Sequence, residues 1–135
     1  MKGSYLLIIK VDTTCTLQLR KHHTLITPGS YGYVGSAMKN LESRILRHAR
    51  RDKKHHWHID YLLDYGEIVD IYYKESTIHE ECDIARFFEQ HFPSISSFGC
   101  SDCTCTSHLF FGAMEDLIRA AKQLHMNKYH LDAKS

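Results

Sequence analysis

Residues 33–48 read YVGSAMKNLESRILRH, and this stretch decides the fold class of the chain. Its first three letters close an apolar run that is typical of a β-strand, and the residues after them are polar and helical in pattern. Leu41 and Ile45 stand four residues apart and indicate the buried side of a helix. On a helical wheel His48 lies about 20° from Leu41 and Arg44 about 60° from it, so we expect both side chains at or near the buried side.

A second motif, Gly3-Ser4-Tyr5, opens the other strongly β-prone run, SYLLIIKV at residues 4–11. This largely apolar run predicts a buried strand in which Ser4 faces the core on the side opposite to Tyr5. Tyr5 and Tyr33 would then stand on strands beside the helix that carries the arginine and the histidine. Such a set suits hydrolysis of a phosphodiester, which needs an activated water and neutralisation of charge on the phosphoryl oxygens.

The remaining pattern predicts an α+β domain, a small and mainly antiparallel sheet flanked by helices. An extra hairpin is expected between the two short motifs at residues 3–5 and 33–35, called triads below. Strands are expected at 4–11, 15–20, 25–27, 31–35, 67–74 and 109–111. Helices are expected at 39–52, where Asn40 could cap the start, and at 57–65, 78–91 and 114–126. We expect one domain over 1–112, with a C-terminal helix and tail at 113–135 packed on it. The last nine residues are polar, which predicts a frayed end.

Composition excludes several classes of protein. The chain has 135 residues and a formal net charge of +1, and none of its apolar runs approaches the ~20 residues of a membrane-spanning helix. The N-terminal run lacks the features of a signal peptide, so we expect a cytoplasmic protein without a membrane partner. Free thiols are then expected at its five cysteines.

Positive charge gathers between Arg44 and Lys54, where six cations accompany a single acid, Asp52. A basic segment in a nearly neutral protein suits local contact with phosphates, although a solvated helix face is the ordinary alternative. Trp57 lies close behind this segment in the sequence and could stack on a base. The residues expected to contact nucleic acid are Arg47, Arg50, Arg51, Lys53, Lys54 and Trp57.

These motifs resemble those of the GIY-YIG nuclease superfamily. Residues 3–5 are similar to its first triad, with Ser4 where isoleucine is usual, and 33–35 are similar to its second. Arg44 matches the essential arginine of the superfamily, and Glu81 its metal-binding glutamate on a later helix. The interval 6–32 between the triads is longer than is typical, and CTLQLRKHHTLI within it is expected to form the additional hairpin.

Three further phrases resemble one prokaryotic branch of the superfamily, whose members occur alone or fused to endonuclease III-like repair glycosylases. They are HWHIDYLL at 56–63, ECDIA at 81–85 and SDCTCTSHLF at 101–110. The resemblance implies a metal-dependent endonuclease that acts on DNA, with repair as its setting and a repair glycosylase as its partner.

The resemblance also implies roles for single residues. Tyr5 would be the general base if a neighbouring cation lowers its pKa from about 10, and Tyr33 would position water or contact phosphate. Arg44 would bind phosphate oxygens, and His48, one turn later, would accept or relay a proton. Glu81 would hold one Mg²⁺ or Mn²⁺ ion.

In the histidine cluster, His58 is the preferred further catalytic residue and His56 the second. The alternative is that these histidines only line a polar edge.

Two other functions stay open. The chain could be a non-catalytic nucleic-acid-binding or docking module, for which the basic segment and Trp57 would suffice. A zinc site could also form in the stretch from 100 to 108, but its spacing lacks the usual paired knuckles, and packed thiols with a histidine bonded to backbone are the favoured interpretation. The candidate zinc ligands are Cys100, Cys103, Cys105 and His108.

Overall fold

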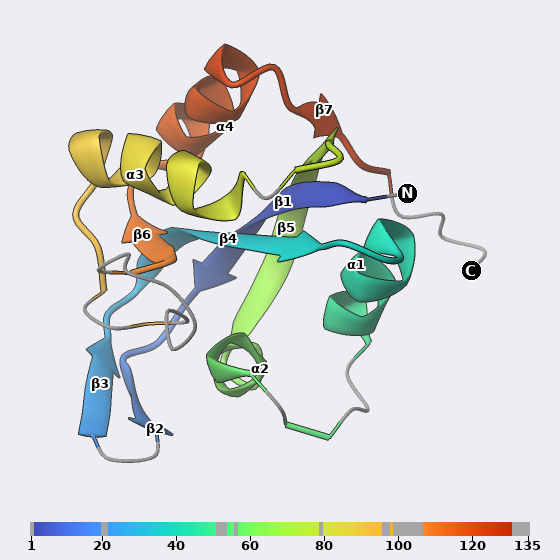
Figure 1. Ribbon diagram of the computed structural model, residues 1–135. Coiled ribbons are helices and arrows are strands. Elements are labelled where there is room, and N and C mark those ends of the chain that lie inside the picture. The colour runs from blue at the N-terminus through green and yellow to red at the C-terminus, as the bar shows by residue number, and fades with distance from the viewer. Residues whose placement is uncertain are drawn as a thin grey trace.

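A computed structural model describes residues 2–19, 22–50, 54–55, 57–78, 80–95, 98 and 107–130. The strands and helices form an α+β arrangement, as predicted, with four strands before the first helix (Figure 1). In chain order they are β1 (Gly3–Val11), β2 (Cys15–Leu19), β3 (His22–Ile26), β4 (Gly29–Ala37), α1 (Leu41–Ala49), α2 (His58–Leu62), β5 (Gly66–Glu75), α3 (Glu81–His91), β6 (Leu109–Phe111), α4 (Met114–Gln123) and β7 (Asn127–Lys128).

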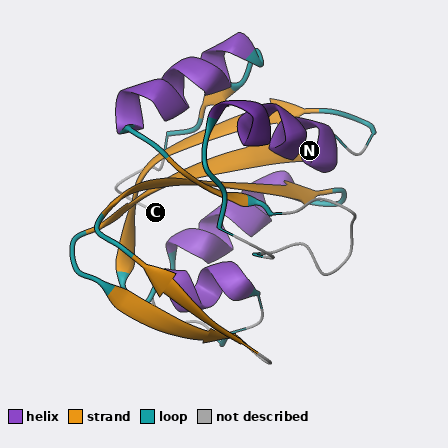
Figure 2. Cartoon of the chain, turned by 90° about the vertical axis from the view of Figure 1, so that its left-hand side faces the viewer, coloured by secondary structure: helices purple, strands orange, loops and turns teal. Residues whose placement is uncertain are grey.

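The main sheet is antiparallel and has the strand order β6-β4-β1-β5-β7. Strand β1 lies at its centre and pairs with β4 over its full length, from Gly3 opposite Ala37 to Val11 opposite Gly29. Helices α1 and α2 lie on one side of the sheet, and α3 and α4 lie on the other (Figures 1 and 2). Because both faces of β1 are covered, its sequence is a nearly continuous apolar run rather than an alternation.

Two hydrophobic cores result, one on each side of the sheet. The core under α1 and α2 contains Tyr5 and Leu7 of β1, whereas the core under α3 and α4 contains Leu6 and Ile8. Ser4 is also buried, on the side opposite to Tyr5, as the alternation of the strand predicted. The side chain of Tyr5 is therefore directed to the same face as α1.

The predicted hairpin is present between the two triads. Strands β2 and β3 form a separate antiparallel pair, with Cys15 opposite Ile26. Leu17 and Ile26 are buried in the core under α1 and α2, which anchors the base of the hairpin. Strand β3 is longer than the expected piece at 25–27, because pairing with β2 extends it back to His22.

Helix ends depend on local chemistry. The predicted cap of α1 is confirmed, because the backbone N–H of Ser43 donates to the Asn40 side-chain oxygen at 3.0 Å. Helix α2 is shorter than expected, since Gly66 opens strand β5 rather than directly ending the helix. None of the helices in the described part of the chain has the length and apolar character needed to cross a bilayer.

The prediction of a frayed C-terminus is wrong for residues 127–130. Strand β7 pairs with Tyr72 and Tyr73 of β5, and the N–H of Tyr129 donates to the carbonyl oxygen of Ile71 at 2.8 Å. The polar sequence of this segment does not predict a strand. Strand β7 forms because the edge of β5 is available for pairing. Residues 131–135 lie outside the described part of the chain.

Candidate active site

Tyr5 and His48 form the centre of the candidate site. The Tyr5 hydroxyl oxygen lies 2.7 Å from His48 Nε2, and both side chains are 2% exposed. Strand β1 supplies the tyrosine and the last turn of α1 supplies the histidine. The helical-wheel prediction that His48 faces inward is thus confirmed. A proton can pass between a hydroxyl and an imidazole that are hydrogen-bonded in this way.

The glycines of the two triads are explained by close approaches. A Cβ atom at Gly35 would lie 2.4 Å from both Cζ and the hydroxyl oxygen of Tyr5, so only glycine lets the tyrosine ring cross strand β4 here. A Cβ atom at Gly3 would lie 2.0 Å from the carbonyl oxygen of Lys74 on the neighbouring strand. The glycines of the two triads therefore allow β1 and the Tyr5 ring to lie close to the neighbouring strands.

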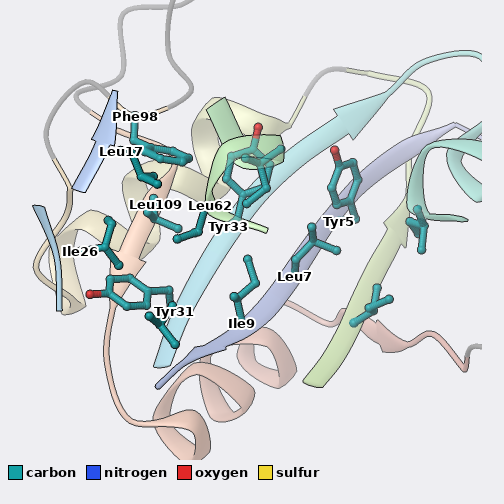
Figure 3. Packing of buried hydrophobic residues seen from close by; sticks show 14 of the residues in the cluster. Tyr5, Leu7, Ile9, Leu17, Ile26, Tyr31, Tyr33, Leu62, Phe98 and Leu109 are labelled. Atoms are coloured by element: carbon teal, nitrogen blue, oxygen red, sulfur yellow. The ribbon is translucent and has the colours of Figure 1, made fainter. Parts of the chain in front are cut away.

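Tyr33 lies beside this pair. It projects from β4 to the same side of the sheet as Tyr5, and Figure 3 shows the two hydroxyl groups pointing in the same direction. The Tyr33 ring packs edge-on against His48, with 6.3 Å between ring centroids. The structure thus brings Tyr5, Tyr33 and His48 together from three separate elements.

Arg44 completes this group from one turn earlier on α1. Its Nη1 donates to the carbonyl oxygen of Ser36 at 3.1 Å, and its guanidinium carbon lies 4.5 Å from the centre of the Trp57 ring. The side chain is half-buried, as its wheel position predicted. A permanently charged, planar group is thereby held next to two tyrosines.

Burial dominates the electrostatics of the two tyrosines. Burial raises the pKa of Tyr5 well above its usual value, the charge of Glu81 raises it further, and Arg44 lowers it only in part. Burial also raises the pKa of Tyr33, with the charges of Tyr5 and Glu81 acting in the same direction. The condition set for Tyr5 as a general base, that a nearby cation lowers its pKa, is not met by Arg44, because desolvation outweighs it.

Glu81 stands at the start of α3, the helix on the other side of the sheet, and Ser36 links it to the group. The Ser36 hydroxyl donates to Glu81 Oε1 at 2.5 Å, while the Ser36 carbonyl receives Arg44. The second carboxylate oxygen lies 2.7 Å from Nδ1 of the buried His108. Ser36 was not predicted as a site residue. Nothing in the sequence after the second triad indicates that Ser36 contacts both Glu81 and Arg44.

The basic segment is partly committed to internal contacts. Arg47 makes a two-point ion pair with the buried carboxylate of Asp60, each nitrogen–oxygen distance being 3.1 Å. Arg50 and Lys54 are exposed, as phosphate contact requires. The predicted contacts Arg51 and Lys53 lie outside the described residues.

The other candidate ligands are only partly described. His58 packs on the Phe98 ring with 5.5 Å between centroids, and Phe98 in turn packs on Tyr33, so His58 lies at the flank of the group. His108 Nδ1 faces Glu81, a contact that the interpretation favoured from sequence did not include. His56 and the three cysteines at 100, 103 and 105 lie outside the described residues. Among the residues that are described, no three His, Cys, Asp or Glu side chains gather as a metal site.

One protein family matches nearly the whole chain. Its sequence profile, DUF123, a domain of unknown function, covers residues 4–130 and thus all the strands and helices from β1 to β7 except the first residue of β1. No curated protein and no solved structure was found to match the chain.

Proposed function

The chain belongs to the DUF123 family, and we propose that it is a metal-dependent endonuclease that hydrolyses phosphodiester bonds in DNA. The observation that carries the proposal is the buried hydrogen bond between Tyr5 and His48, with Arg44 beside it. With the two triads, this arrangement supports a place for the chain in the GIY-YIG superfamily, in the prokaryotic branch that also occurs fused to repair glycosylases.

The raised pKa of Tyr5 defines how it would act. Its hydroxyl would keep its proton at neutral pH, and the proposal requires the His48 tautomer in which Nε2 accepts that proton. As Tyr5 takes a proton from the attacking water, its own proton moves to His48. The new oxygen–phosphorus bond forms while the bond to the leaving oxygen breaks, and that oxygen leaves with the electron pair. No tyrosinate needs to accumulate, so burial of Tyr5 is compatible with catalysis.

Arg44 would supply the positive charge at the phosphoryl group. One of its nitrogens is used on the Ser36 carbonyl, and a guanidinium has further N–H donors for phosphate oxygens. Tyr33, with its hydroxyl on the same side as that of Tyr5, would position the water or the phosphate. Exposed Arg50 and Lys54 would contact the flanking backbone of the nucleic acid.

Glu81 would hold a single magnesium or manganese ion in this proposal. Mg²⁺ commonly binds through one or two carboxylates, with water and substrate phosphate as its other ligands. The Glu81 side chain is 26% exposed and is held in place by Ser36 and His108, so it can present an oxygen to such an ion. A bound ion would stabilise negative charge on the phosphoryl and leaving oxygens.

A second candidate function is a non-catalytic nucleic-acid-binding or docking module, with a repair glycosylase as its partner. It is favoured by the burial of both tyrosines, which are 2% and 7% exposed, and by their raised pKa values. The basic surface at Arg50 and Lys54 would serve that function without any chemistry.

Cleavage of a labelled panel of branched, nicked and single-stranded DNA separates the two functions. We expect products from the wild type with Mg²⁺ or Mn²⁺ but not with EDTA, and none from Arg44→Ala or Glu81→Gln, with folding checked by circular dichroism. Salt-sensitive binding without products from any protein would instead support the docking module. Metal-dependent cleavage that survives in both variants would refute the assignment of residues.

A further inference from the structure

The Trp57 ring contacts three residues of α1, although the sequence predicted only that it could stack on a base. The guanidinium carbons of Arg44 and Arg47 lie 4.5 Å and 4.4 Å from its centre. The His48 ring lies 5.8 Å away, centroid to centroid. One aromatic side chain thus touches both α1 residues to which we give a part in the chemistry.

Asp60 and Arg47 hold Trp57 in this place. The backbone N–H of Trp57 donates to Asp60 Oδ2 at 3.0 Å, and the same carboxylate pairs with both terminal nitrogens of Arg47. One of these nitrogens also donates to the carbonyl oxygen of Lys54 at 3.0 Å. The Asp60 side chain is fully buried, so this carboxylate fixes the start of α2 against α1.

We propose that Trp57, held by Asp60 and Arg47, is a positioning residue that fixes the Arg44 guanidinium in the orientation needed to bind a phosphate. The proposal rests on the function proposed above. It replaces the expectation that Trp57 stacks on a base, because the ring already contacts two guanidinium groups. An aromatic face holds the plane of a guanidinium and leaves its N–H edge open to a phosphate.

The geometry gives this contact a specific effect. An arginine side chain has many rotamers, and selecting one of them costs free energy at the moment of binding. Arg44 is restrained at one nitrogen by Ser36 and at its guanidinium carbon by the face of Trp57, so the free-energy cost of selecting a rotamer is met on folding. Loss of the ring should therefore slow the chemical step more than it weakens binding.

A double-mutant cycle tests the contact without any nucleic acid. Arg44→Met, Trp57→Leu and the double variant are unfolded in urea, and their midpoints are compared with that of the wild type. We expect the double variant to lose less than the sum of the two single losses. Additive losses would overturn the proposal whether or not the protein is a nuclease.

Fluorescence then separates positioning of Arg44 from stacking on a base. Trp57 is the single tryptophan of the chain, so emission reports on this ring alone. We expect a short duplex DNA in EDTA to change the emission of the wild type but not that of Arg44→Met at saturating DNA. An equal change in Arg44→Met would show direct stacking and overturn the proposal.

Single-turnover cleavage gives the functional readout. We expect Trp57→Leu to slow the rate at saturating DNA by about tenfold to a hundredfold, and Trp57→Phe to recover most of it, because phenylalanine restores an aromatic face. Tyr65→Leu is the matched control, since it removes an exposed aromatic side chain between α2 and β5.

A wild-type rate in Trp57→Leu would overturn the proposal, and so would an equal loss in Trp57→Phe. Absence of cleavage in the wild type would instead refute the proposed nuclease, while the urea cycle still decides whether Trp57 holds Arg44.

Discussion

Gly35 shows how a residue without a side chain can define the position of a candidate catalytic group. The Tyr5 ring occupies the space where a Cβ atom of residue 35 would lie, and this brings its hydroxyl to His48. The pattern of the second triad could be read from the sequence. The need for glycine at position 35 could not be predicted, because the ring that a Cβ atom would meet belongs to Tyr5, thirty positions earlier.

Gly35→Ala should therefore destabilise the protein by about 1–3 kcal/mol, since the tyrosine ring must move away from its present place. Gly32→Ala on the same strand is the control. Its Cβ would meet only the side chains of Leu6 and Leu117 at 3.2 Å, and we expect a change within about 1 kcal/mol. Urea unfolding measures both, and equal losses would contradict the close-approach argument.

In helices α1 and α2, the sequence periodicity predicts which side chains face inward, but not the contacts between the two helices. The wheel positions of Arg44 and His48 were predicted correctly, because they depend only on spacing along one helix. The ion pair between Arg47 and Asp60 joins α1 to α2, and because its partners lie thirteen residues apart in the sequence, no local pattern predicts it. Arg47 was expected to contact nucleic acid, whereas its charge is paired inside the protein.

Asp60→Asn should cost about 3 kcal/mol of unfolding free energy, the lower end of what breaking a buried pair costs, because Arg47 remains 24% exposed. Asp64→Asn is the control on the same short segment. Its pair with His55 is exposed on both sides and should contribute less than about 1 kcal/mol. Similar midpoints for the two variants in urea would argue against Asp60 as the anchor of α2.

At the scale of the whole molecule, the fold class could be predicted from the strand and helix patterns, and the core strands β1 and β5 lie within one residue of the predicted limits. Two features depended on partners far away in the sequence. Strand β4 extends to Gly29 and Ala37 because β1 pairs along its entire length. Strand β7 is polar and exists because β5 presents an edge to it.

Stability should fall in alkaline solution because of the buried tyrosines. Burial raises the pKa of Tyr5 and Tyr33 above the ordinary value of 10.0, so the unfolded chain loses these protons at lower pH than the folded one. Their contribution to stability is complete below about pH 10 and is lost as pH rises toward the folded-state pKa. Urea midpoints between about pH 8 and pH 11 should fall less steeply for Tyr33→Phe than for the wild type. Equal slopes would contradict the burial argument.

Single-turnover cleavage of saturating DNA by Tyr5→Phe tests the account most directly. The ring is kept and only the hydroxyl bonded to His48 is lost, so we predict a rate lower by about a hundredfold or more with binding unchanged. Tyr31→Phe is the control, because that buried hydroxyl donates to the Thr27 carbonyl oxygen at 2.7 Å, and its loss should leave the rate intact. A Tyr5→Phe protein that cleaves as fast as Tyr31→Phe would contradict the proposed proton path.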